Sequence, residues 1–180
     1  RADFFRKELE EYLLLTRENN IPATRFKGSY AGAIGQPQFM PSSYRYYAVA
    51  YDGKGIKDLQ HNSDDVIVSV ANYLKKHGWQ ANEPVVLPAK VTGNQYQHLD
   101  SKNMKPRFDH QELVKHGITP AQKLAKEDKA FLITLEAENS LEFWVGLQNF
   151  YAITRYNPSV NYAMAVYQLS QQIDDLKKQS

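Results

Sequence analysis

The most informative stretch of the chain runs from Gly28 to Ser43, and its sequence is Gly-Ser-Tyr-Ala-Gly-Ala-Ile-Gly-Gln-Pro-Gln-Phe-Met-Pro-Ser-Ser. Three glycines and two prolines in 16 residues exclude a single long helix or strand. We expect a loop, a short helical turn and a helix that begins near Pro41 with a serine cap. The small residues and the Gln38 amide can line one wall of a cleft. The alternative is a purely structural turn between helices.

Helices are predicted on both sides of this stretch. Residues 3–18 have apolar side chains at helical spacing with charges between them. Residues 63–77 begin with acids and end with Lys, Lys and His before Gly78, a charge order that complements a helix dipole. We expect Ser63 or Asp64 to cap this second helix.

The middle of the chain differs in character, because β-branched residues become frequent. Residues 84–91 predict a strand, and residues 108–113 predict a short helix that ends by Gly117. Residues 130–136 and 141–147 predict a hairpin around Glu-Asn-Ser. Helical spacing returns in residues 149–155 and 160–178. The pattern predicts a mainly α (α+β) fold in three parts, with a helical core at 1–82 and 148–180 and an α+β insert at 83–147.

Composition excludes several classes of protein. The 22 basic and 20 acidic residues nearly balance, which argues against nucleic acid as a partner. The chain has no cysteine, so disulfides and thiolate metal sites are excluded, and we expect no cofactor. Tyrosine is frequent, with 12 residues, and a tyrosine-rich cleft suits a saccharide, although an ordinary aromatic core explains the same count.

Three blocks of sequence resemble the membrane-bound lytic murein transglycosylase B family. They are Lys27–Tyr44, Ser69–Trp79 and Asn149–Asn157, the last followed by Tyr162–Tyr167. They occur in the family's order and together span nearly the whole chain. The resemblance implies a lysozyme-like core with a small strand-containing insert, a periplasmic location and a parent protein anchored to the outer membrane.

The resemblance also implies an activity. Members of that family cleave the β-1,4 bond between N-acetylmuramic acid and N-acetylglucosamine in peptidoglycan and form a 1,6-anhydro product. One glutamate acts first as general acid and then as base, so it needs a setting that keeps it protonated beforehand. Peptidoglycan glycan strands are therefore the implied partner, together with proteins of cell-wall synthesis or division. A hydrolytic lysozyme that uses water is a further alternative.

The family's glutamate is expected well before Gly28, in a segment that resembles Gly-Val-Glu-Thr. The acids found there are Asp3, Glu8, Glu10, Glu11 and Glu18, all on the first predicted helix and none with those flanks. We expect them to form a solvated helix face. This chain is therefore expected to be inactive alone and to associate with a missing N-terminal segment. The alternative is a module that binds or scaffolds peptidoglycan without cleaving it.

Other roles are implied residue by residue. Ser29 and Gln38 match groups that support the catalytic carboxylate, with a helix cap and a turn residue as the structural alternatives. Further matches line the sugar subsites, and their alternative is core packing. These are Tyr73, Tyr151, Tyr156, Phe39, Met40 and Asn157.

A calcium loop of EF-hand type occupies the position of residues 50–61 in several relatives. Here Asp52, Asp58 and a central glycine remain, while Ala50, Lys54 and His61 occupy three positions that need oxygen ligands. We predict no calcium site. We further expect the Lys54 ammonium to replace the metal's charge by pairing with Asp52 or Asp58.

Overall fold

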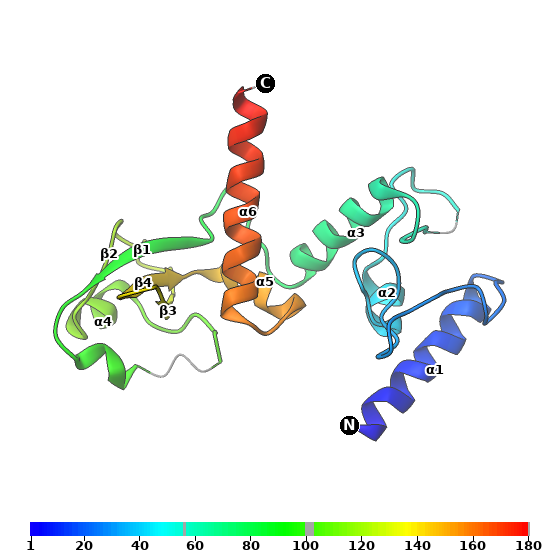
Figure 1. Ribbon diagram of the computed structural model, residues 1–180, viewed down its shortest axis with the longest axis horizontal. Coiled ribbons are helices and arrows are strands. Elements are labelled where there is room, and N and C mark those ends of the chain that lie inside the picture. Colours follow the sequence, from blue (N-terminus) through cyan, green and yellow to red (C-terminus); the bar gives the residue numbers. More distant parts are fainter. Residues whose placement is uncertain (56, 100–102, 180) are drawn as a thin grey trace. The chain divides into compact units, whose positions relative to one another are not determined.

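The structure, a computed structural model, describes residues 1–55, 57–99 and 103–179 (Figure 1). The chain folds as two compact units, Arg1–Lys76 and His77–Ser180. This division falls slightly before the predicted boundary at residue 82, and the three-part division into core, insert and core stays a prediction.

The first unit contains the three predicted helices: α1 (Ala2–Glu18), α2 (Pro41–Tyr47) and α3 (Ser63–Lys76). The predicted caps are wrong. The α3 cap is Asn62, whose Oδ1 accepts hydrogen bonds from the N–H groups of Asp64 at 3.0 Å and Asp65 at 3.4 Å. For α2, the cap is the side chain of Glu8 on α1, which accepts hydrogen bonds from Ser42. A serine inside α2 is already helical and cannot occupy the capping position before it.

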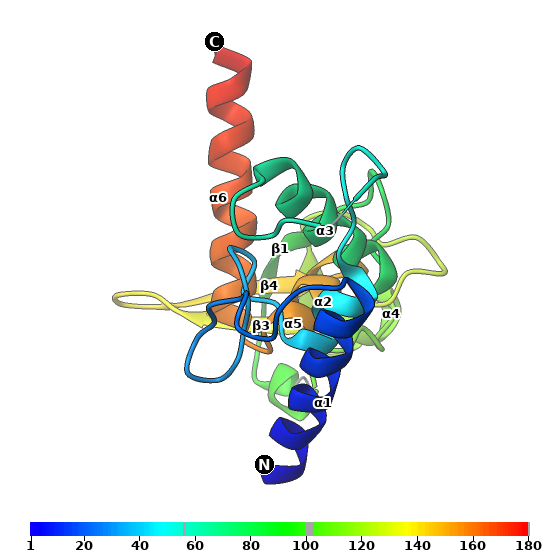
Figure 2. The ribbon, with the colours of Figure 1, turned by 90° about the vertical axis from the view of Figure 1, so that its right-hand side faces the viewer.

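Helix α1 lies against α2 (Figure 2), and charged side chains of α1 contact α2. Glu8 is only 8% exposed and contacts Ser42, while Arg45 pairs with both Glu11 and Glu18. The expectation that these acids form a solvated face is therefore wrong for Glu8, and Asp3, Glu11 and Glu18 are engaged in ion pairs. The helical spacing of 8, 11 and 18 places the three carboxylates on one side.

The apolar residues of α1 lie largely on another side and are exposed. Phe5, Leu9 and Leu13 follow one another at intervals of four residues, and Leu9 and Leu13 are more than half exposed. We call these three residues the outer stripe of α1. The amphipathic pattern was predicted, but the buried side of α1 combines Leu15, which is 2% exposed, with the carboxylates that contact α2.

The second unit is built around a four-stranded antiparallel sheet with the order β2-β1-β4-β3. The predicted strand and hairpin are confirmed as β1 (Val86–Val91), β3 (Phe131–Glu136) and β4 (Leu141–Gly146). Strand β2 (Ile118–Pro120) and a short 3-10 helix, η1 (Gln95–His98), were not predicted. Strand β2 is too short to show an alternating pattern.

Three helices complete this unit: α4 (His110–Lys115), α5 (Gln148–Tyr156) and α6 (Val160–Gln179). Helix α4 begins with a capping box, in which Asp109 and Glu112 exchange side-chain to backbone hydrogen bonds of 2.9 Å each. The core packs α4 and the sheet together through apolar side chains. They are Leu87, Leu113, Ile118, Leu124, Ala130, Leu132, Val145 and Leu147.

Helix α6 extends beyond the sheet of its own unit in both views (Figures 1 and 2). Buried residues occur only in its first half, Ala163 and Met164. Beyond them, apolar side chains recur at alternating intervals of four and three residues. We call these the α6 stripe: Tyr162, Val166, Leu169, Ile173 and Leu176, all at least 37% exposed.

Candidate functional site

The glycine-rich bend of the first unit folds into two linked turns. Ile34 forms isolated bridges with Gly28 on one side and Phe39 on the other. Gly35 has a φ of +71°, and a Cβ at this position would lie 2.5 Å from the Leu59 carbonyl oxygen. The next N–H, from Gln36, donates to that same oxygen at 2.8 Å. Close approach to the loop around Leu59 therefore requires glycine here.

Gln38 lies on the second turn with its backbone in the left-handed region, at a φ of +52°. Its N–H and its Nε2 both donate to the Gly35 carbonyl, at 3.1 and 2.8 Å. The residue is exposed, and these hydrogen bonds fix its backbone. Gln38 is thus both the predicted turn residue and an available polar group.

Ser29 begins the first turn. Its N–H donates to the Ala33 carbonyl at 2.9 Å, and its Oγ accepts from the Ala33 N–H at 3.2 Å. The residue is exposed and borders two hollows in the same unit. One hollow, of about 730 Å³, is polar and also contains Gln38. Its lining is Arg25, Lys27, Gly28, Ser29, Gly35, Gln36, Gln38, Gln60 and His61.

The second hollow measures about 380 Å³ and is mostly apolar. It runs between the outer stripe of α1 and the first turn of the glycine-rich bend. Phe5, Leu9, Phe26 and Ile34 contribute apolar surface, and Glu8 is the carboxylate among its lining residues. A groove of this character suits an apolar chain segment better than a sugar.

Aromatic side chains of the first unit pack together near the bend. Phe39 is 3% exposed and Tyr73 is 8% exposed, with their ring centroids 5.7 Å apart. Tyr47 packs edge-on to Tyr73 at 4.8 Å. Met40 is half-buried. Phe39 and Tyr73 therefore belong to the core of this unit as it stands, and their predicted contact with sugar stays a prediction.

The remaining predicted residues lie on α5 or directly after it, in the second unit. Tyr151 is half-buried beneath the Arg155 guanidinium, which lies 5.4 Å from the ring centroid. Tyr156 is half-buried, and the exposed Asn157 ends the helix. Burial, with the nearby Arg155 charge as a smaller cause, lowers the pKa of His77 in the same unit. Helix α5 and the residue that follows it therefore carry aromatic and polar groups together.

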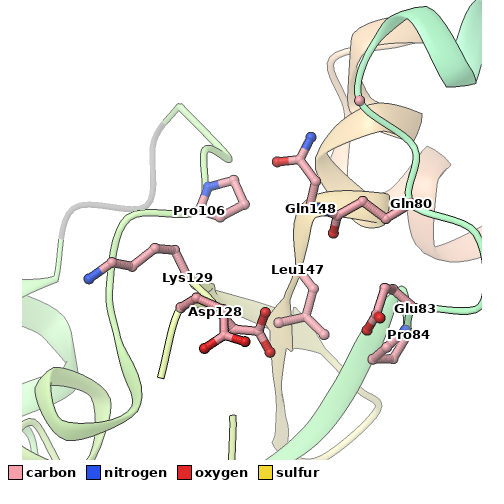
Figure 3. A pocket seen from close by; sticks show the side chains of 10 residues that line it. Gln80, Glu83, Pro84, Pro106, Asp128, Lys129, Leu147 and Gln148 are labelled. Carbon is pink, nitrogen blue, oxygen red and sulfur yellow. The ribbon is translucent and has the colours of Figure 1, made fainter. Parts of the chain in front are cut away.

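A further hollow of about 430 Å³ lies in the second unit and was not predicted (Figure 3). Its lining combines two amides, Gln80 and Gln148, with charged groups from the loop before β3 and the apolar Leu147. Asn149 is 1% exposed and holds its rim by accepting from the Gln80 N–H and donating to the Gln80 and Glu83 carbonyls, at 2.7 to 2.8 Å. Asn149 is the first residue of the third motif block, and this position was the sequence signal that could have pointed to it.

The loop at residues 50–61 is held by backbone hydrogen bonds to carboxylates. Asp52 accepts from the Lys54 N–H at 2.9 Å, and Asp58 accepts from two following N–H groups. The buried Asp65, which the sequence did not single out, accepts from the N–H groups of Tyr51 and Asp58, both at 2.8 Å. The Lys54 side chain is exposed, and no ion pair joins it to Asp52 or Asp58 in the described residues.

The expected replacement of a metal by Lys54 is therefore wrong, because these carboxylates already satisfy backbone donors. Within residues 1–55, 57–99 and 103–179, no group of three or more His, Asp or Glu residues is placed to hold a metal ion. The absence of calcium itself stays a prediction.

The glycine-rich bend, α2 and α5 carry the motif blocks of the sequence and also the candidate site residues. The chain matches the family described as the Transglycosylase SLT domain over residues 1–171, and it belongs to that family. Membrane-bound lytic murein transglycosylase B of Escherichia coli is 43% identical over 173 residues, which cover 96% of this chain and 46% of that protein.

Solved structures show the same likeness. A catenated lytic transglycosylase, SltB1 of Pseudomonas aeruginosa, superposes with a TM-score of 0.92 at 45% identity, over 98% of this chain and 58% of that chain. SltB3 of the same organism, solved with NAG-NAM-pentapeptide, gives 0.76 at 32% identity, over 92% and 45%. The predicted family and the mainly α (α+β), lysozyme-like class are confirmed. The chain spans about half the length of these relatives.

Proposed function

We propose that this chain is part of a peptidoglycan lytic transglycosylase and supplies glycan-binding surface to it. The reaction proposed for the parent protein is cleavage of the MurNAc-β-1,4-GlcNAc bond with formation of a 1,6-anhydro-muramyl product. Family membership is the observation on which the proposal rests. A relative solved with NAG-NAM-pentapeptide supports glycan strands as the ligand class.

The exposed groups suit a saccharide. Gln38 offers an amide fixed by its backbone, and Ser29 borders the same polar hollow. In the second unit, Tyr151 and Tyr156 offer aromatic surface, which complements the C–H faces of a sugar ring, and Asn157 adds a polar group. Met40, Phe39 and Tyr73 are proposed to support the part of this surface that lies in the first unit.

We further propose that the chain does not contain the catalytic glutamate. A general acid has to be protonated before it acts. The Arg45 hydrogen bond instead holds the pKa of Glu18 below its usual value, and Glu11 pairs with the same guanidinium. Both Glu8 oxygens accept hydrogen bonds from Ser42. The Arg45 contact therefore favours the ionised form of Glu18, and the Glu8 and Glu11 carboxylates are both held in contacts with α2.

The test uses purified peptidoglycan sacculi. The chain is expected to sediment with sacculi and to release no 1,6-anhydro muropeptides, as measured by mass spectrometry of the soluble products. Anhydro products from the chain alone would overturn the proposed inactivity, and reducing-end products would indicate hydrolysis. Absence of sedimentation would contradict glycan binding.

The alternative function is a binding or scaffolding module whose parent protein does not cleave glycan. The two proposals differ in the longer protein. If a longer form with a Gly-Val-Glu-Thr-like segment forms anhydro products, and its Glu→Gln variant does not, the scaffold alternative is excluded. An inactive longer form that still binds sacculi favours the scaffold.

Association with an N-terminal segment is proposed on the outer stripe of α1. This stripe is exposed, and it borders the apolar hollow beside the glycine-rich bend. A helix that carries the family's Gly-Val-Glu-Thr-like sequence is the proposed occupant. Restoration of anhydro-product formation on mixing the chain with such a segment tests the association.

We propose a periplasmic location, because the substrate class is peptidoglycan, with the parent anchored to the outer membrane; the name of a relative, which calls it membrane-bound, supports a membrane anchor. Among the described residues, every helix is too short or too polar to span a membrane. Proteins of cell-wall synthesis or division are proposed partners. Fractionation of cells that express the longer protein tests the location.

A further inference from the structure

Glu8 makes the most buried polar contact between α1 and α2. The residue is 8% exposed, and its two carboxylate oxygens accept from the Ser42 N–H at 3.0 Å and from the Ser42 Oγ–H at 2.7 Å. The two residues are 34 positions apart in the sequence. A charged acceptor with two donors at these distances is a strong and geometrically defined contact.

This contact serves as the cap of α2. The helix follows Met40, and the side chain of Met40 makes no capping hydrogen bond. The first N–H groups of a helix have no partner within it, and a carboxylate beside them is favoured by the helix dipole. Glu8 supplies both the acceptor and the charge from a neighbouring helix.

The start of α2 is coupled to Gln38 by a short and stiff stretch of chain. Only three residues separate Gln38 from Ser42. Pro41 has a restricted φ, and the buried Phe39 exchanges backbone hydrogen bonds of 2.7 and 3.1 Å with Ile34. A shift of Ser42 is therefore transmitted to the turn before it.

Gln38 needs such support, because its φ of +52° is unfavourable for a residue with a side chain. We infer that Glu8 is a positioning residue: by fixing Ser42, it holds the Gln38 turn in the geometry that binds glycan. The inference rests on the proposed function. It assigns Glu8 a role distinct from that of a general acid and from that of a solvated helix residue.

The test compares variants of the isotopically labelled 180-residue chain by NMR, with titration of a soluble GlcNAc–MurNAc oligosaccharide. Glu8→Ala is expected to move the backbone amide resonances of Ser42 and Gln38 and to weaken glycan affinity by about three- to tenfold, the range for a lost cap. Glu8→Gln keeps the shape and one acceptor, so it should restore most of both. Ser42→Ala retains the N–H and should have a smaller effect.

Glu10→Ala is the matched control, because Glu10 is exposed on the same helix. It should leave the resonances and the affinity unchanged. If Glu8→Ala does not fold, Ser42→Ala still tests the inference, since its smaller change has to be centred on residues 38–42 and has to weaken glycan affinity. Unmoved resonances at Gln38, or moved resonances with unchanged affinity, would overturn it. If the unmodified chain binds no oligosaccharide, the proposed function fails, while the resonance shifts still test the cap.

Discussion

Gly35 shows how one backbone position controls the bend. Its positive φ and the 2.5 Å approach of a Cβ to the Leu59 carbonyl predict two separate penalties for a side chain. We expect Gly35→Ala to lower the free energy of unfolding by about 2–4 kcal/mol, since strain and a backbone clash add. Urea unfolding measures this change.

Gly32 provides the control for that experiment. It has a φ of +88°, but a Cβ there would have no atom within 4 Å. Gly32→Ala should therefore cost only the conformational strain, about 1 kcal/mol. Equal losses in the two variants would show that close approach to Leu59 is unimportant.

Arg45 makes stability depend on pH. Its hydrogen bond holds the pKa of Glu18 below the usual value of 4.5. A carboxyl group whose pKa is depressed by folding stabilises the folded state above its unfolded pKa, and the contribution is lost as pH falls through the folded pKa. We expect stability to decrease below about pH 4.5. Arg45→Met should lower stability at pH 7 and flatten this decrease.

Arg6→Met is the comparison, because the Arg6–Asp3 pair is fully on the surface, with side chains 78% and 89% exposed. Exposed pairs contribute little to stability. Thermal unfolding between pH 3 and 7 should leave this variant close to the unmodified chain. A steep acid loss that persists in Arg45→Met would assign the effect to other groups.

Residues 50–61 give a prediction about metal. Asp52 and Asp58 are occupied by backbone N–H groups, and the exposed Lys54 repels a cation nearby. Millimolar calcium or EDTA should therefore leave the thermal unfolding midpoint unchanged. An upward shift specific to calcium, and not seen with magnesium, would contradict this expectation.

At the scale of elements, Asn149 joins the start of α5 to the segment before β1. Its side chain satisfies the Gln80 N–H and carbonyl and the Glu83 carbonyl while 1% exposed. Asn149→Ala removes three hydrogen bonds made by a buried side chain, so we expect a loss of about 2–3 kcal/mol in the free energy of unfolding. Calorimetry of this variant and of Asn161→Ala, an exposed control on α6, would test it.

The existence of most elements was predictable because periodicity is a local property. Residues 63–77 and the 130–147 hairpin show it clearly, and both are confirmed. Caps were predicted poorly. The partner of α2 is 34 residues away, and Asn62 lies just outside the periodic pattern that drew attention to Ser63. Strand β2 exists only because β1 offers it a partner.

At the scale of the whole molecule, two helices display apolar stripes. The α6 stripe has the alternating spacing of a helix that packs along another helix. Leu169 is 57% exposed, so Leu169→Lys should change the unfolding free energy of the chain by less than about 0.5 kcal/mol. Urea unfolding of this variant measures the change.

Gln171→Lys is the matched control, because it adds the same charge outside the stripe. The two variants should have equal free energies of unfolding. A larger loss in Leu169→Lys would show that the α6 stripe contributes to the stability of the chain.

The sequence alone determined the family, the main helices and the hairpin, because motifs and hydrophobic spacing are written along the chain. It also placed Ser29 and Gln38 on a bend, since glycine and proline restrict the backbone locally. Only the tertiary structure decided which way α1 faces, that Glu8 is a buried cap, and that Phe39 and Tyr73 lie in the core. Those outcomes depend on which residues of distant segments meet, and burial and hydrogen bonding between them are absent from any local pattern.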